Sequence, residues 1–151
     1  MADGTLTVVT NRRARFDYDL SDRFEAGLVL TGSEVKSLRE AKAHLQEAFV
    51  MVRKDGLDLM NSFIAPYAMG GYSNHEPTRP RRLLLHKAEI EKLVKGTQQK
   101  GFTIVPLRLY FRGGRAKLEV ALGKGKKTVD KRNTIAEREA KRRINRALKS
   151  R

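Results

Sequence analysis

The sequence predicts a mainly β protein with helices: a small antiparallel β-barrel (OB-fold-like), with two or three flanking helices and a basic C-terminal tail. Three observations support this prediction. Short segments alternate apolar and polar residues and end in glycine-containing turns, two other segments have helical spacing, and the last 28 residues carry a net charge of +9. Five or six short strands with two inserted helices are typical of such a barrel.

The clearest β-hairpin lies near the end of the predicted barrel. Residues 102–111 are rich in β-branched and aromatic side chains, and residues 115–122 alternate apolar and polar side chains after the turn at Gly113-Gly114. Alternation on both sides of a Gly-Gly pair is a strong hairpin signal. Pro106 has no backbone N–H to donate, so it predicts a bulge or a strand edge within this hairpin.

A second predicted hairpin joins residues 44–53 to residues 57–64 through Lys54-Asp55-Gly56, because Asp-Gly between apolar segments favours a tight turn. We expect two further strands upstream, at 15–20 and 24–30.

Helices are expected at residues 33–42 and 87–100, where apolar residues recur every three or four positions. Residues 66–80 contain three prolines and two glycines and are expected to form a loop.

The charge of the chain points to a polyanionic partner. The 151 residues include 32 Lys and Arg against 17 Asp and Glu, a net charge of +15. The chain divides into a predicted body, residues 1–123 with +6, and a tail, residues 124–151 with +9, which we expect to be disordered when free. No apolar segment reaches the ~20 residues of a membrane span, and the N-terminus lacks the pattern of a secretory signal, so we expect a cytoplasmic protein.

Enzyme motifs are scarce in this sequence. The chain has no cysteine, which excludes disulfides, cysteine zinc sites and thiol nucleophiles. No phosphate-binding loop, nucleophile elbow or His-Glu-x-x-His motif is present, and the three histidines stand far apart. We therefore expect no catalytic residues, no metal site and no cofactor.

Basic residues beside aromatic ones indicate RNA binding at two places. Asn11, Arg12, Arg13 and Arg15 precede Phe16 and Tyr18, so guanidinium groups could hold phosphates while rings stack on bases. The alternative is a solvated arm with both rings in the barrel wall. The segment 79–85 combines arginines that could contact RNA with leucines that belong in the core by default.

The tail has the pattern of a conditional helix. Thr134 and Glu137 fit a capping box, and Ala136, Ala140, Ile144 and Leu148 follow at intervals of four. Such a narrow apolar stripe gives a marginal helix, which a polyanion could stabilise over about residues 135–149. The alternative is a nonspecific basic tail.

Seven motifs in order along the chain resemble those of bacterial small protein B (SmpB), the SsrA-binding protein family. They are Asn11-Arg12-Arg13-Ala14-Arg15, Phe24-Glu25-Ala26-Gly27-Leu28, Gly32-Ser33-Glu34-Val35-Lys36-Ser37-Leu38-Arg39, Pro77-Thr78-Arg79, Arg82-Leu83-Leu84-Leu85-His86, Lys124-Gly125-Lys126-Lys127 and Asp130-Lys131-Arg132. The resemblance covers nearly the whole chain from Asn11 onward.

The resemblance implies an OB-type barrel that binds the tRNA-like domain of transfer-messenger RNA (SsrA RNA). It implies delivery of that RNA to stalled ribosomes for trans-translation, with the tail reading the empty decoding centre and messenger channel. Elongation factor Tu is an expected partner in the delivery complex, and the protein is expected to act as a monomer without bond chemistry.

The predicted site residues fall into two groups. The RNA-binding residues of the body are Asn11, Arg12, Arg13, Arg15, Glu25, Glu34, Lys36, Arg39, Arg82, Leu84 and Lys117. The ribosome-binding residues of the tail are Lys124, Lys126, Lys127, Asp130, Lys131, Arg132, Arg138, Arg142 and Arg143.

Two positions, Val129 and His44, depart from the family pattern, and the role of a third, Glu25, is open. Glu25 could accept hydrogen bonds from RNA or form a structural ion pair, and the sequence does not separate the two. Val129 stands where the family usually has an aromatic residue or His, so a stacking contact there is in doubt. His44 replaces the Asn that is frequent in the family.

Two other function classes remain open at this point. A ribosomal or general RNA-binding protein with a basic extension explains the charge but not the Asp130-Lys131-Arg132 motif. An RNA-processing enzyme would need a catalytic cluster that the sequence does not display.

Overall fold

The computed structural model describes residues 5–71, 74–126 and 128–149, with the side chains of residues 128–134 and 147–149 outside the described set. The elements, in chain order, are β1 (Thr5–Thr10), α1 (Ala14–Asp17), β2 (Tyr18–Leu28), α2 (Gly32–Arg39), β3 (Ala43–His44), β4 (Phe49–Arg53), β5 (Gly56–Met60), β6 (Phe63–Ile64), β7 (Arg81–Leu84), α3 (Lys87–Thr97), β8 (Phe102–Arg112), β9 (Arg115–Gly125) and α4 (Thr128–Lys149). No helix in these ranges is both long enough and apolar enough to span a bilayer.

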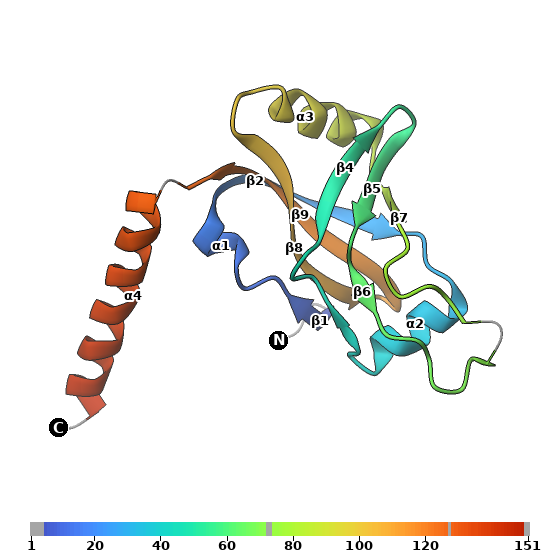
Figure 1. Cartoon of the computed structure of the whole chain (residues 1–151), viewed down its shortest axis with the longest axis horizontal. Helices are drawn as coiled ribbons and strands as arrows, with labels where there is room; N and C mark the ends of the chain where they lie inside the picture. The colour runs from blue at the N-terminus through green and yellow to red at the C-terminus, as the bar shows by residue number, and fades with distance from the viewer. Residues whose placement is uncertain (1–4, 72–73, 127, 150–151) are drawn as a thin grey trace.

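The fold is built on one seven-stranded sheet in the order β1-β8-β9-β2-β7-β5-β4, and β3 and β6 form a separate two-stranded ladder. Every pairing in the described residues is antiparallel. The sheet curls until β4 approaches β8 (Figure 1), although backbone pairing of the described strands does not close it. The predicted mainly β, OB-like architecture with flanking helices is confirmed, in the form of a curled open sheet.

The two predicted hairpins are confirmed. β8 and β9 pair along their whole length, and Gly113 and Gly114 in the turn have φ of 57° and 77°, which L side chains rarely adopt. The register shifts between Pro106 and Arg108, so the predicted bulge is present. β9 continues to Gly125, three residues beyond the predicted strand.

One local prediction was wrong, and two strands were not predicted. Residues 15–17 are helical rather than extended, because Ala14 is buried against Val105, Leu107 and Ala121 and the following turn closes on itself. The strands β1 and β7 were not predicted. The two arginines at the start of β7 obscured the β pattern of this strand, which pairs with β2 and β5.

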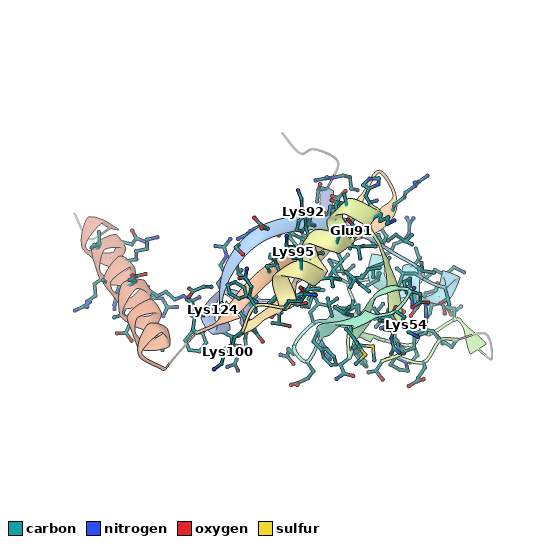
Figure 2. All side chains as sticks on the ribbon, turned by 90° about the horizontal axis from the view of Figure 1, so that it is seen from above. Lys54, Glu91, Lys92, Lys95, Lys100 and Lys124 are labelled. Atoms are coloured by element: carbon teal, nitrogen blue, oxygen red, sulfur yellow. The ribbon has the colours of Figure 1, made fainter. Side chains whose placement is uncertain are left out.

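The main core lies inside the curled sheet, and the helices α2 and α3 each contribute a buried leucine to it. Leu93 of α3 is fully buried and belongs to the same core cluster as Ile104, Leu118 and Leu122 of the β8–β9 hairpin. Burial of such a side chain contributes roughly 1.5–3 kcal/mol. The opposite side of α3 carries Lys92 and Lys95, which are exposed (Figure 2).

The helix α2 begins with a capping box. Thr31 Oγ1 accepts a hydrogen bond from the Glu34 backbone N–H (3.4 Å), and Glu34 Oε1 accepts one from the Thr31 N–H (2.8 Å). The helix α4 begins at Thr128, six residues before the capping box predicted in the tail, and projects away from the sheet beside α1 (Figure 1). The division into body and tail, and the state of the free tail, stay predictions.

Candidate nucleic-acid interface

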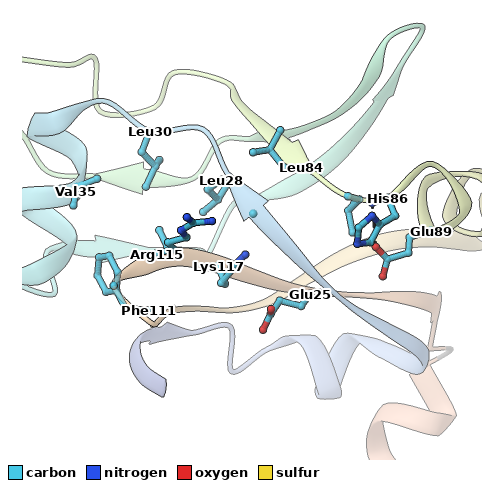
Figure 3. A pocket seen from close by; sticks show the side chains of 14 residues that line it. Glu25, Leu28, Leu30, Val35, Leu84, His86, Glu89, Phe111, Arg115 and Lys117 are labelled. Atoms are coloured by element: carbon cyan, nitrogen blue, oxygen red, sulfur yellow. Dashed lines mark hydrogen bonds between the residues drawn. The ribbon is translucent and has the colours of Figure 1, made fainter. Parts of the chain in front are cut away.

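One pocket brings together three of the predicted RNA-binding residues. Glu25 on β2, Leu84 on β7 and Lys117 on β9 line a cavity of about 580 Å³ together with His86, Glu89 and Arg115 (Figure 3). We call this cavity the Leu84 pocket. Its walls come from the four strands β2, β7, β8 and β9 and from the helices α2 and α3, so residues up to 92 positions apart in sequence meet there.

Leu84 is the apolar wall of this pocket. Its side chain is 57% exposed, whereas that of its neighbour Leu83 is 3% exposed and belongs to the core. Successive strand residues face opposite sides, which explains the difference. A Cβ at Gly27 would lie 3.3 Å from the Leu84 Cβ, so this glycine lets β2 and β7 approach closely. The default assignment of Leu84 to the core is therefore wrong.

Glu25 is held by two donors from β8. The Tyr110 hydroxyl donates to Glu25 Oε2 (2.5 Å), and Arg112 Nη1 lies 2.6 Å from the same oxygen. Among the described residues none donates to Oε1. The alternatives for Glu25 are thus compatible, because an internal ion pair uses one oxygen and leaves the other as an acceptor.

Tyr110 is a permanent donor in this arrangement. Burial and the hydrogen bond to Glu25 raise the pKa of its hydroxyl well above the ordinary value. Its ring is covered by Arg108 (4.3 Å from guanidinium carbon to ring centroid) and Arg112 (5.6 Å), and the residue is 2% exposed.

Lys117 lies on the central strand β9, between the strands that carry Glu25 and Tyr110. It pairs with Gly27 of β2 on one side and with Tyr110 of β8 on the other. It therefore lies at the wall of the Leu84 pocket, beside Gly27 and on the strand next to Tyr110. A cation in this position can meet a phosphate while Glu25 and Leu84 meet the sugar or base of the same nucleotide.

The structure corrects the prediction for Glu34. Its side chain is completely buried and accepts hydrogen bonds from Arg79 Nε (3.1 Å) and Arg81 Nε (2.6 Å). Burial raises the pKa of Glu34, but the hydrogen bonds from Arg79, the Thr31 N–H and Arg81 outweigh it, so the net pKa lies below its usual value. Glu34 joins α2 to β7 and does not face a ligand.

Arg82 is also engaged within the protein. Its Nε donates to Asp58 Oδ1 (2.6 Å) and its Nη2 to Asp55 Oδ1 (3.1 Å), which ties β7 to the β4–β5 hairpin. Two carboxylates offset its charge. The structure therefore gives Arg82 an internal role, and its predicted RNA contact stays a prediction.

The N-terminal basic motif divides between two surfaces. Asn11 supports the Pro106 bulge, because its Nδ2 donates to the Pro106 carbonyl (2.9 Å) and its N–H to the Leu107 carbonyl (2.7 Å). Arg13 lies 3.6 Å from Asp17 in an ion pair. Arg12 and Arg15 are exposed and line a different cavity, described below.

The remaining body residues lie around α2. Lys36 is above the Tyr67 ring (5.5 Å) and Arg39 above the Phe111 ring (5.5 Å). Both are exposed, so each can reach a ligand from the side of α2.

The predicted tail residues begin at the end of the sheet. Lys124 is the penultimate residue of β9, Lys126 follows the strand, and Arg138, Arg142 and Arg143 are exposed on α4. Lys127 and the side chains of Asp130, Lys131, Arg132 and Val129 lie outside the described residues.

The histidines have local roles in the structure. His44 stacks on Phe63 with 4.7 Å between ring centroids. His75 binds Ser33 Oγ through Nδ1 and the Ile64 carbonyl through Nε2, both at 2.9 Å. Within the described residues, no group of three or more His, Cys, Asp or Glu side chains could hold a metal ion.

Four arginines of the interface were missed: Arg23, Arg108, Arg112 and Arg115. Arg108, Tyr110 and Arg112 alternate with the buried Leu109 and Phe111, so the two-residue period of the strand carried the signal. Arg115 and Lys117 continue the pattern on β9. The outer face of the central strands therefore carries arginine and lysine side chains around the buried Tyr110.

Comparison with known proteins shows to which family the chain belongs. Residues 8–150 match the family model described as SmpB protein. The SsrA-binding protein of Thermobifida fusca is 55% identical over 148 residues, covering 98% of this chain and 92% of the relative. The SsrA-binding protein of Acidothermus cellulolyticus is 51% identical over 145 residues, covering 96% of this chain and 91% of that protein.

A solved structure agrees with these relatives. It is described as "tmRNA-SmpB: a journey to the center of the bacterial ribosome" and is 45% identical, with a TM-score of 0.67, covering 83% of this chain and 86% of the solved chain. Family model, relatives and fold coincide over nearly the full length, and the chain belongs to the SmpB family of SsrA-binding proteins.

Proposed function

We propose that this protein binds the tRNA-like domain of transfer-messenger RNA and delivers that RNA to stalled ribosomes for trans-translation. Family membership supports this function, as does the similarity to a protein solved in a tmRNA–SmpB study of the ribosome. The structural observation that carries the proposal is the meeting of Glu25, Leu84 and Lys117 in one exposed pocket. Donors, acceptors and an apolar surface together suit an unpaired nucleotide better than a regular duplex.

The body and the tail have separate tasks in this proposal. The Leu84 pocket and the arginine-rich face around it bind transfer-messenger RNA. The tail enters the empty decoding centre and messenger channel, where the exposed Arg138, Arg142 and Arg143 of α4 meet ribosomal phosphates. Val129 has no ring to stack on RNA, so anchoring depends on the neighbouring charged residues.

The proposal extends to the wider complex. The protein acts as a monomer in the cytoplasm, in a delivery complex that also contains elongation factor Tu. It positions RNA and carries out no bond chemistry. Its role is to occupy the part of the stalled ribosome where a codon–anticodon pair would otherwise form.

The first test identifies the RNA. The tagged full-length protein is recovered from cells, and the bound RNA is sequenced. Enrichment of one species, transfer-messenger RNA, supports the proposal. A broad mixture of cellular RNAs would instead indicate a general RNA-binding protein.

The second test separates a placed acceptor from general electrostatics. Glu25→Arg should weaken binding of transfer-messenger RNA although it adds positive charge, because an acceptor becomes a donor. Asp22→Arg on the same strand is the matched control, since Asp22 is exposed and the change in charge is identical. Equal or tighter binding by both variants would show that net charge alone governs this surface.

A further inference from the structure

A second cavity lies on the same face of the sheet as Glu25. It has a volume of about 490 Å³ and is lined by four arginines and one carboxylate: Arg12, Arg15, Arg23, Arg108 and Glu119. We call it the arginine cavity. Its residues come from the segment between β1 and α1, from α1 itself, and from β2, β8 and β9.

The register fixes the position of this cavity relative to the Leu84 pocket. Glu119 of β9 pairs with Glu25 of β2 and with Arg108 of β8. Lys117 of the Leu84 pocket is two residues away from Glu119 on the same strand and the same face, a distance of about 7 Å. The arginine cavity is therefore within reach of one or two nucleotides from a nucleic-acid strand bound in the Leu84 pocket.

The charges in the arginine cavity are only partly offset. Arg23 Nη1 and Arg108 Nε lie 3.6 and 3.8 Å from Glu119 Oε1, longer than hydrogen bonds. Within the part of the chain that the structure describes, no acidic side chain forms an ion pair with Arg12 or Arg15. One carboxylate thus faces four guanidinium groups, which leaves a concentrated positive charge beside a hollow.

Part of the arginine cavity is already ordered. Arg108 Nη1 donates to Thr7 Oγ1 (3.2 Å), and its guanidinium lies on the Tyr110 ring. A side chain that is held in place before binding loses less conformational entropy when a ligand arrives. Arginine presents planar pairs of N–H donors, which match the geometry of phosphate oxygens.

We propose that the arginine cavity binds a backbone phosphodiester of the same RNA that occupies the Leu84 pocket. The phosphate oxygens accept hydrogen bonds from guanidinium groups that Glu119 does not saturate. Arg12, Arg15 and Arg23 donate to them. Arg23 and Arg108 thereby add an anchor to the basic motif around Arg12. This inference rests on the proposed function, because it requires RNA on this face.

The test compares two full-length variants that each lose two positive charges. Arg12→Gln/Arg23→Gln alters the arginine cavity. Lys92→Gln/Lys95→Gln alters exposed lysines on α3, which packs against the opposite face of the sheet (Figure 2). Equal thermal unfolding midpoints establish that both variants are folded.

Affinity for transfer-messenger RNA is then measured between 50 and roughly 300 mM salt. Loss of one phosphate contact should reduce the slope of log K against log salt by about 0.7 for the cavity variant, and the affinity should fall about tenfold. The lysine variant should keep the wild-type slope. Ethylation of individual phosphates should identify one position that weakens binding to the wild type and has no effect on the cavity variant.

Equal slopes for the two variants, or an unchanged ethylation pattern in the cavity variant, would overturn the phosphate site. That result is distinct from a failure of the proposed function, in which the wild-type protein itself would not select transfer-messenger RNA.

Discussion

Tyr110 on β8 donates its hydroxyl hydrogen to Oε2 of Glu25 on β2 across the intervening strand β9, over 2.5 Å. This contact fixes the carboxylate and explains how an acidic side chain belongs to a basic surface. Arg112 binds the same oxygen, so the charge of Glu25 is partly offset while Oε1 can still accept a hydrogen bond.

Tyr110→Phe should lower the affinity for transfer-messenger RNA about tenfold, since a hydrogen bond to a charged group contributes about 1.5–3 kcal/mol. The ring that supports Arg108 and Arg112 is kept. Tyr18→Phe is the control, because it removes a hydroxyl from a tyrosine at the other end of β2, which does not contact Glu25. If Tyr110 acts through Glu25, the effect should disappear in a Glu25→Gln background, and additive losses would show that Tyr110 acts independently.

Leu84→Ala and Leu83→Ala should separate function from stability. Leu83 is buried, so its truncation should lower the free energy of unfolding by about 2–5 kcal/mol. Leu84 is exposed, so its truncation should change stability by less than about 0.5 kcal/mol yet weaken RNA binding. Urea unfolding and RNA titration measure both quantities. If Leu84→Ala bound RNA with normal affinity, the Leu84 side chain would not be part of the RNA interface.

Glu34→Gln should destabilise the fold by about 3–5 kcal/mol at neutral pH, because Arg79 and Arg81 would lose their shared carboxylate. The pKa of Glu34 is lowered in the folded protein, so its contribution to stability is present above the ordinary glutamate pKa of 4.5 and is lost as the pH falls through the lowered pKa.

The stability difference between wild type and Glu34→Gln should therefore shrink in acid, as followed by urea unfolding from pH 7 to pH 3. The exposed Glu91→Gln is the control and should follow the wild type. A difference that stays constant over this range would argue against a charged Glu34 in the folded state.

Gly123→Ala should destabilise the protein by about 1–3 kcal/mol, because an added Cβ would lie 2.8 Å from Val105 Cγ2 and 3.1 Å from Tyr18 Cβ. Gly125→Ala on the same strand has open space and should leave the thermal midpoint unchanged or slightly raised. Equal midpoints for the two variants would contradict the close packing of β9 against β2 and β8.

Replacing Asp130, Lys131 and Arg132 together by Ala should preserve binding of transfer-messenger RNA but block tagging of a peptide made from a message without a stop codon. The reason is that the body holds the RNA while the tail acts on the ribosome. Leu84→Ala should lower both binding and tagging. Normal tagging by the triple variant would refute the proposed role of the tail.

The parts of the fold that the sequence predicted are those fixed by local pattern. The β8–β9 hairpin, its Pro106 bulge and the helices α2 and α3 follow from alternation, turn residues and helical spacing. The strand β7 did not follow, because its place in the sheet depends on pairing with β2 on one side and β5 on the other. Local pattern cannot show that Arg81 is completely buried when its partner lies 47 residues away.

The sequence by itself determined the family, the basic character and the chemical groups available for RNA, since these depend on residue identity and order. Only the tertiary structure decided which of two glutamates in neighbouring motifs is accessible from the surface. Glu34 is enclosed by Arg79 and Arg81, while Glu25 is held at the surface by Tyr110, which lies 85 residues away in sequence. The cost of burying a carboxylate depends on the donors that surround it, and those donors are brought together only when the sheet forms.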